Sequence, residues 1–380
     1  MKGTAFIVLL PLLLLGPLNG RATAAVGLVA PGLTPIQLPG RGIVVDPNTR
    51  IPGLVSAKTP RSELTVRPDR DAPADVADLK ADLNEARDAR AGTNVAVGVI
   101  LGVLALIAVV TRSGVLARAA VLYAPAAIGL GLAWRSPAAI GLVALALALT
   151  AGLPQRIFVP LLFFVFAAAL IVQWHWPVTN ALATIGPHPD GGHRFYGVTN
   201  QVETMLLAPA LAGRLLLAPL ALVAVGWSRA GADGGGIATY GAGYAMLALR
   251  SYGRLTLRRL AVASAIVVAG GLLFVAVDAA TGGSSHVTHA VGHDLPGDLA
   301  HRWRVSYDGA TRSAGAFIMF ASGIALLVAV ARVRPRPSLV DAMLVALAVS
   351  FVVNDTPQDV ALWGALGAMA LLAYGRSRVR

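Results

Sequence analysis

Long apolar segments, separated by short loops that carry arginine, are the feature that most limits how this chain can fold. A helix that crosses a bilayer needs roughly 20 predominantly apolar residues, and runs close to this length recur along the chain. Of its 380 residues, 56% are hydrophobic and only 13% are charged, and the mean hydropathy is +0.70. Soluble domains carry about 25% charged residues. The sequence therefore predicts an all-α polytopic membrane protein.

The excess of Lys and Arg over Asp and Glu in the chain fits this prediction. A formal net charge of +12 would suggest a nucleic-acid partner in a soluble protein. Here the arginines lie between apolar runs, as membrane topology requires, and no basic helix or basic patch interleaved with aromatic residues is present. We therefore expect the lipid bilayer, and not nucleic acid, as the partner. The absence of cysteine excludes disulfides, a thiol nucleophile and thiolate metal ligands.

The N-terminal quarter divides into two segments. Residues 1–24 have a basic start, an apolar core and the motif Ala22-Thr23-Ala24, which together are typical of a cleaved signal peptide. The alternative is an uncleaved anchor helix, but prolines interrupt the apolar core. Residues 25–93 predict a small extracytoplasmic segment with at most one strand pair. It ends in an amphipathic helix between Pro73 and Arg90, followed by a helical transmembrane domain over residues 94–380.

The number of spans depends on the stretch from Met205 to Trp227, which has Arg214 at its middle. Read as one span, it buries Arg214 near the bilayer centre at a cost of roughly 2.5 to 3.5 kcal/mol. Read as two, it turns at Arg214 and places this residue at the cytoplasmic surface. We favour two, which gives about eleven spans: 94–110, 116–134, 138–153, 157–174, 196–213, 215–228, 237–249, 260–277, 315–331, 339–353 and 360–374.

The arginines predict the orientation of these spans. With the N-terminus outside and the C-terminus cytoplasmic, the short loops place 14 arginines inside and 6 outside, in agreement with the positive-inside rule. The segment 237–249 is short, so a re-entrant segment remains an alternative there. This orientation predicts a multi-pass protein of the cell membrane, with the polar loops and all seven histidines on the extracytoplasmic side.

The stretch from Gly186 to Thr204 carries the strongest candidate site. Asn200 and Glu203 lie three residues apart at the mouth of an apolar segment, where they share a helix face. We predict a catalytic group of Glu203, Asn200 and His193. The substrate-binding candidates are Arg194, Tyr196, Gln201 and Asp233. The alternative role for Glu203 is a buried hydrogen-bond network that holds helices together, with Asn354, Asp355 and Asp278 as candidate partners.

A second candidate site consists of histidines in the loop over residues 281–313. His286, His289 and His293 have the spacing i, i+3, i+7, so on a helix they share one face, and Asp294 is adjacent. Imidazole and carboxylate are ordinary ligands of zinc and similar ions. The spacing predicts a divalent metal cofactor, against the alternative of a flexible loop that contains histidines.

Three short motifs carry a resemblance to a known group of proteins. They are Gly192 to Gly197 followed by Asn200 and Glu203, Gly231 to Gly235, and Gly282 to His286. With them, residues 75–380 resemble the membrane part of poorly characterised bacterial multi-span proteins with an outer GGxRFYGxxNxxE loop. Some of those proteins have an ectodomain like alkaline phosphatase. This chain has only the segment Ala25 to Thr93 there, without a metal-binding Asp/His set, so the resemblance does not imply phosphatase activity.

The sequence leaves the activity open between classes of membrane protein. We expect a polar site that faces outward and serves cell-envelope processes, either as an enzyme or as an assembly partner for lipid-linked or other envelope substrates. The alternative is a transporter or flippase-like protein with an outward-opening cavity. Charged groups collect at one face of the membrane with almost none at its midplane, where ion-coupled transporters place their sites.

Overall fold

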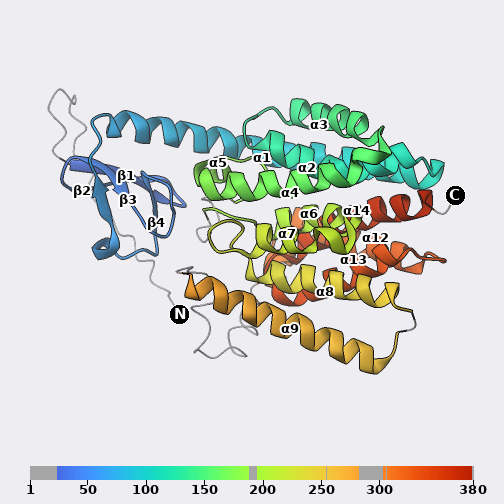
Figure 1. Cartoon of the computed structure of the whole chain (residues 1–380). Coiled ribbons are helices and arrows are strands. Elements are labelled where there is room, and N and C mark those ends of the chain that lie inside the picture. The colour runs from blue at the N-terminus through green and yellow to red at the C-terminus, as the bar shows by residue number, and fades with distance from the viewer. Residues whose placement is uncertain (1–23, 188–194, 254, 282–302, 305, 379–380) are drawn as a thin grey trace, which may run out of the picture.

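The chain folds into a helical bundle with a small β-sheet at one end (Figure 1). The computed structural model describes residues 24–187, 195–253, 255–281, 303–304 and 306–378. The signal peptide predicted for residues 1–24 lies almost wholly outside this part and stays a prediction.

The N-terminal segment forms a five-stranded sheet, so the prediction of at most one strand pair was wrong. Strand β1 pairs antiparallel with β2 on one side, and on the other side it pairs parallel with β3 and then with β4, while β5 pairs with β3. Long-range pairing of this kind has no local sequence signal. The strands are β1 Ala24–Ala30, β2 Thr34–Pro39, β3 Gly42–Val45, β4 Leu54–Ser56 and β5 Thr65–Arg67.

Every apolar segment predicted as a span corresponds to a helix. These helices are α1 Ala72–Thr111, α2 Gly114–Gly131, α3 Pro137–Gly152, α4 Phe158–His175, α6 Asn200–Ala212, α7 Arg214–Gly226, α8 Gly234–Ser251, α9 Leu257–Ala280, α12 Ala314–Arg332, α13 Ser338–Val353 and α14 Pro357–Ser377. A short helix, α5 Pro177–Ala181, and two 3-10 turns, Arg61–Glu63 and Gln155–Ile157, lie between them. Six of the described helices are long and apolar enough to cross a membrane: α1, α2, α4 (counted from Gln155), α9, α12 and α14. The count of eleven crossings therefore stays a prediction.

Helix α1 joins two parts that the sequence suggested separately. The amphipathic helix predicted between Pro73 and Arg90 continues without interruption into the first apolar segment. Its first half packs against one face of the sheet, where Leu28, Leu54, Val76 and Leu83 are buried together. Helix α1 therefore attaches the sheet to the bundle.

Helix α14 lies at the centre of the bundle, and α9 lies at its edge. Helix α14 packs against α1, α2, α6, α12 and α13, and most of its side chains are buried. Helix α9 packs chiefly against α8, and Asp278 is its one buried residue. The core between the helices consists largely of alanine and leucine with a few large aromatic side chains.

Alternate turns gather at one end of the bundle, which we call the arginine end. Arg118 at the start of α2 donates to the Gly152 carbonyl at the end of α3 (2.7 Å). Arg118, Arg214 and Arg378 all lie close enough to Tyr374 to interact with it electrostatically. Arginines at this end in the described residues are Arg112, Arg118, Arg156, Arg214, Arg250, Arg258, Arg259, Arg332, Arg334, Arg336, Arg376 and Arg378.

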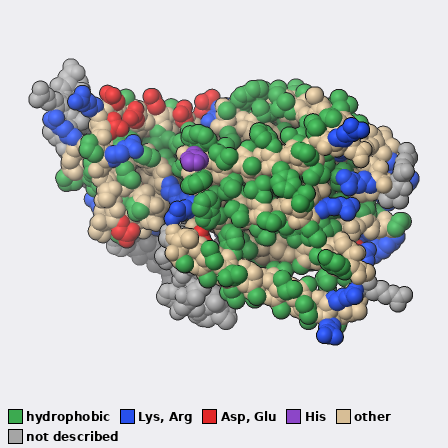
Figure 2. All heavy atoms as spheres, viewed as in Figure 1, with side chains coloured by type: hydrophobic (Ala, Val, Ile, Leu, Met, Phe, Trp, Pro, Cys, Tyr) green, Lys and Arg blue, Asp and Glu red, His purple; other side chains and the backbone are tan. Residues whose placement is uncertain are grey.

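The remaining turns gather at the opposite end of the bundle, next to the sheet. We call this the sheet end. Thr184 donates its backbone N–H to the Gly131 carbonyl (2.9 Å), and Val198 donates to the Gly231 carbonyl (2.7 Å). The acidic side chains visible in Figure 2 lie mainly over the sheet and the start of α1, whereas Lys and Arg side chains appear at both ends, over the sheet and near the C-terminus. Apolar side chains cover the face between the two ends.

Helices α6 and α7 form an antiparallel hairpin that turns at Arg214. Val198, before α6, bonds to Gly231, after α7. Arg214 has a positive φ of 58° and lies near Tyr374 at the arginine end. A helix break at Arg214, as the reading of two spans requires, is therefore observed.

Candidate functional site

Glu203 lies at the start of α6, where the chain passes from the loop into the bundle. The Thr199 side chain caps this helix by accepting the Val202 N–H (3.4 Å). Glu203 is in the first turn, where a carboxylate interacts favourably with the helix dipole. Its side chain has no exposed surface. Burial of this kind requires hydrogen-bond partners, because an unsatisfied carboxylate costs several kcal/mol or more.

The partners of Glu203 come from α8 and from the turn between α13 and α14. Asn354, directly after α13, donates its Nδ2 to Glu203 Oε2 (2.7 Å) and also to Ser350 Oγ (2.7 Å). Tyr240 on α8 donates its hydroxyl to the backbone carbonyl of Glu203 (2.9 Å). Ser350 and Tyr240 are fully buried, and Asn354 is 7% exposed. Glu203 is thus bonded to both α8 and the α13–α14 turn.

Asn200 and Glu203 share a helix face, as their spacing predicts. Asn200 Nδ2 donates to Asp355 Oδ1 and to Thr356 Oγ1 (3.2 Å), so both residues face the turn between α13 and α14. Gln201 points elsewhere: its Nε2 donates to Asn94 Oδ1 on α1 (2.8 Å). The structure therefore separates Gln201 from the pair that the sequence places beside it.

Asp233 serves as the N-cap of α8. It is 3% exposed, and its Oδ1 accepts the Gly236 N–H (3.3 Å). Asp233 and Glu203 both lie close enough to Tyr240 to interact with it electrostatically. Gly235 follows in the first turn of α8, and a Cβ at this position would overlap Asn354 Oδ1. The glycine thus allows α8 to approach the Asn354 amide that binds Glu203.

Tyr196 connects the candidate site to the sheet. The Arg50 guanidinium stacks 3.8 Å from the centre of the Tyr196 ring and donates to the Ser228 carbonyl (2.9 Å). The next residue, Gly197, has a φ of +82°, and a Cβ there would overlap the Gly231 carbonyl. The motif that ends at Gly197 and the motif that begins at Gly231, two of the three that carry the resemblance, therefore pack against each other at the sheet end.

The other predicted site residues lie outside the described part of the chain. These are His193, Arg194, His286, His289 and His293. The divalent metal cofactor predicted from the three histidines stays a prediction. Within the described residues, His175 is the one histidine, and no group of three or more metal-ligating side chains is present.

Several contacts were not predicted from the sequence. Tyr240 lies in an apolar helix, and its only local signal is the spacing of Tyr240 and Tyr244 on one face. Asp278, a candidate partner of Glu203, instead accepts the Ser228 hydroxyl (2.8 Å) and fixes the end of α9. Nothing in the sequence indicated the contacts of Arg50, because they join segments that lie far apart in the chain.

The arrangement can exchange a proton or bind a polar group at the sheet end. A carboxyl group in a site of low polarity can accept a proton from a substrate group, or hold one, when its neighbours donate hydrogen bonds. The same bonds also hold α6, α8 and α13 together. No family model, curated protein or solved structure matches this chain. The geometry therefore carries the functional argument, and the resemblance stays a prediction.

Proposed function

We propose that this chain is a multi-pass protein of the cell membrane whose sheet end faces the cell envelope. The site around Glu203 acts there on lipid-linked or other envelope substrates, as an enzyme or an assembly partner. The observation that carries the proposal is convergence: polar side chains from α6, from α8 and from the α13–α14 turn meet at one end of an apolar bundle. Buried ionisable groups in a membrane protein are a default sign of function.

The depth of the site supports a substrate at the membrane boundary. Glu203 lies within the first turn of α6, and Asn354 and Asp355 lie in the turn between two helices. A site at this level meets the head group of a lipid-linked molecule, whereas transporters place their sites near the bilayer midplane. The sheet, connected through Arg50, covers the same end.

A transporter or flippase-like protein is the second candidate. The observation that favours it is the complete enclosure of Glu203 by surrounding helices. In that case an occluded state would open toward the sheet end to release its cargo. A carboxyl group that gains and loses a proton would then couple the opening to the proton gradient.

The arginines in the loops support the orientation of this proposal. In the loops between the apolar helices, twelve described arginines lie at the arginine end and four at the sheet end, and cytoplasmic loops are the ones that carry excess Lys and Arg. The Lys and Arg residues of the N-terminal sheet segment are left out of this comparison, because the rule applies to short loops. The arginine end therefore faces the cytoplasm and the sheet end faces outward. A cleaved signal peptide would deliver the sheet to that side.

Complementation of a deletion strain tests the role of Glu203. We expect the strain to accumulate a lipid-linked envelope precursor, measurable by mass spectrometry of its lipid extract, and wild-type protein to remove it. Glu203→Gln keeps the size and most of the hydrogen bonding of the side chain but cannot ionise. It should express at the normal level and fail to remove the precursor.

The matched control is Asp278→Asn, a change of the same type at a buried carboxylate of the sheet end. Asp278 bonds to Ser228 and lies outside the Glu203 contacts, so this variant should remove the precursor. A well-expressed Glu203→Gln protein that works as well as wild type would contradict the proposed chemical role. Glu203→Ala, if it lowers yield while Glu203→Gln is active, would assign the residue to helix packing.

A further inference from the structure

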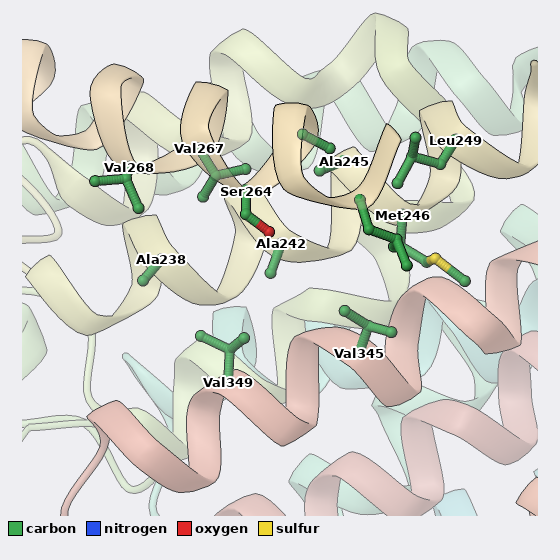
Figure 3. Close-up of a pocket in the computed structure, with 12 residues that line it drawn as sticks. Ala238, Ala242, Ala245, Met246, Leu249, Ser264, Val267, Val268, Val345 and Val349 are labelled. Atoms are coloured by element: carbon green, nitrogen blue, oxygen red, sulfur yellow. The ribbon is translucent and has the colours of Figure 1, made fainter. Parts of the chain in front are cut away.

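A groove on the edge of the bundle lies between α8, α9 and α13 (Figure 3). Its volume is about 310 Å³, near the lower end of the range of about 300 to 1,000 Å³ for ligand pockets. Figure 3 shows Ala238 and Ala242 of α8, Ser264 of α9, and Val345 and Val349 of α13 around it. Almost all lining groups are apolar, so the groove suits a hydrocarbon ligand.

The groove reaches the surface that faces lipid. Val268 lines it and is 62% exposed, and Val345 lines it and is 37% exposed. Helix α9 stands partly away from the bundle. It is held at the sheet end by the Asp278–Ser228 bond and at the arginine end by Arg259, which donates to the Tyr252 carbonyl (3.2 Å). Small side chains on α8 leave the space between these two attachments open.

The length of the groove matches one leaflet of a bilayer. Its lining on α8 runs from Ala238 to Leu249, which corresponds to about 16 Å at a rise of 1.5 Å per residue. The hydrocarbon core of a bilayer is about 30 Å thick, so the groove covers about half of it. It begins at the arginine end, because Leu249 and Leu260 both line it there.

Positive charge lies at this mouth of the groove. Arg250 follows Leu249, while Arg258 and Arg259 precede Leu260. Among the described residues one carboxylate is nearby: Asp341 pairs with Arg250 (2.9 Å) and with Arg336. The basic groups outnumber this carboxylate, so the mouth attracts an anionic head group, by about 1 kcal/mol per Lys or Arg near a membrane surface.

We infer that the groove binds one acyl chain of an anionic phospholipid from the leaflet at the arginine end, with the phosphate at Arg250, Arg258 and Arg259. The groove and the Glu203 site lie on opposite sides of the α8–α13 layer. Tyr240 and Ser350 face Glu203, whereas Ala242 and Val349 face the groove. The inference is therefore independent of the function proposed for Glu203.

Native mass spectrometry of the full chain tests this site. Delipidated protein in detergent is titrated with phosphatidylglycerol or phosphatidylcholine of identical acyl chains. We expect one phosphatidylglycerol to bind in preference to phosphatidylcholine. Arg258→Gln combined with Arg259→Gln should reduce this preference by about fivefold per charge. Equal binding of the two lipids by wild-type protein would overturn the inference.

Two substitutions fill the groove from opposite walls, Ala242→Phe on α8 and Ser264→Phe on α9. Each should weaken phosphatidylglycerol binding by more than about tenfold, since a few displaced CH₂ groups remove that much affinity. The matched control is Ala146→Phe on the exposed face of α3, which should bind like wild type. Two groove variants are used so that the test still gives an answer if one of them does not fold. Unchanged binding by a folded groove variant would also overturn the inference.

Discussion

Asn354 is the residue on which the geometry of the candidate site most depends. Its amide nitrogen is shared between Glu203 and Ser350, and its amide oxygen lies against Gly235 at the start of α8. A single side chain therefore fixes the relative positions of α6, α8 and α13. Moving it would leave the buried carboxylate of Glu203 with fewer donors, which is costly at low polarity.

Gly235→Ala should displace the Asn354 side chain without contacting Glu203 directly. The added Cβ would overlap Asn354 Oδ1, and Asn354 has little freedom to shift because two acceptors hold its nitrogen. We expect a loss of about 1 to 3 kcal/mol, the cost of a buried polar group that loses its partner. Thermal denaturation of the purified protein in detergent measures the effect.

The matched control is Gly129→Ala on α2, where an added Cβ has no neighbour within 4 Å. Alanine in a helix interior is about 0.5 to 1 kcal/mol more stable than glycine, so this variant should be at least as stable as wild type. Equal stability of Gly235→Ala and Gly129→Ala would show that Asn354 is not held as the structure has it.

For individual residues, the sequence predicted which positions belong to the candidate site better than it predicted which side chains they contact. The polar residues at the mouth of an apolar segment pointed to Asn200 and Glu203, because polar groups are rare there. Asn354 and Asp355 were candidates for the same reason. The sequence could not tell that Asn354 binds Glu203 while Asp278 binds Ser228, since those pairings depend on how helices pack.

Among the elements, the α6–α7 hairpin has the greatest effect on the architecture. Asn200 contacts Thr356 at the start of α14, Ala208 lies beside Gly367, and Arg214 lies near Tyr374. Helix α6 thus runs parallel to α14 along most of its length, and α7 returns. The energetic cost of burying Arg214 in a single span was enough to predict this turn from the sequence.

A cysteine at Arg214 tests where the hairpin turns. The wild-type chain has no cysteine, and Arg214 is exposed at the turn. In Arg214→Cys we expect the thiol to react with an impermeant maleimide in inverted membrane vesicles and to stay unreacted in intact cells. A thiol unreactive on both sides, as at mid-membrane, would support the single span.

The sheet shows where sequence reasoning failed at the scale of elements. Its strands are short, and two of them pair with one side of β1 in succession. Local patterns such as GIVV indicated a strand but gave no partner, because pairing in a sheet is set by residues distant in sequence. The apolar helices were predictable because their signal lies within each segment.

At the scale of the whole molecule, the two ends differ in chemistry. The arginine end collects arginines from six separate parts of the chain, and the sheet end collects the buried polar contacts of Glu203 and Asp233 and the more exposed contact of Asn200. This polarity was predictable from the order of arginines and apolar segments. The sidedness of the two ends in the membrane is the central claim of the proposed function.

Cysteine labelling at the two ends tests that claim most directly. Thr34→Cys lies on β2 of the sheet and Gln155→Cys lies in the turn between α3 and α4, and both positions are exposed. In intact cells an impermeant maleimide should label Thr34→Cys and not Gln155→Cys, while inverted vesicles should give the opposite pattern. Both thiols should react after denaturation. Labelling of Gln155→Cys alone in intact cells would contradict the account, because the Glu203 site would then face the cytoplasm.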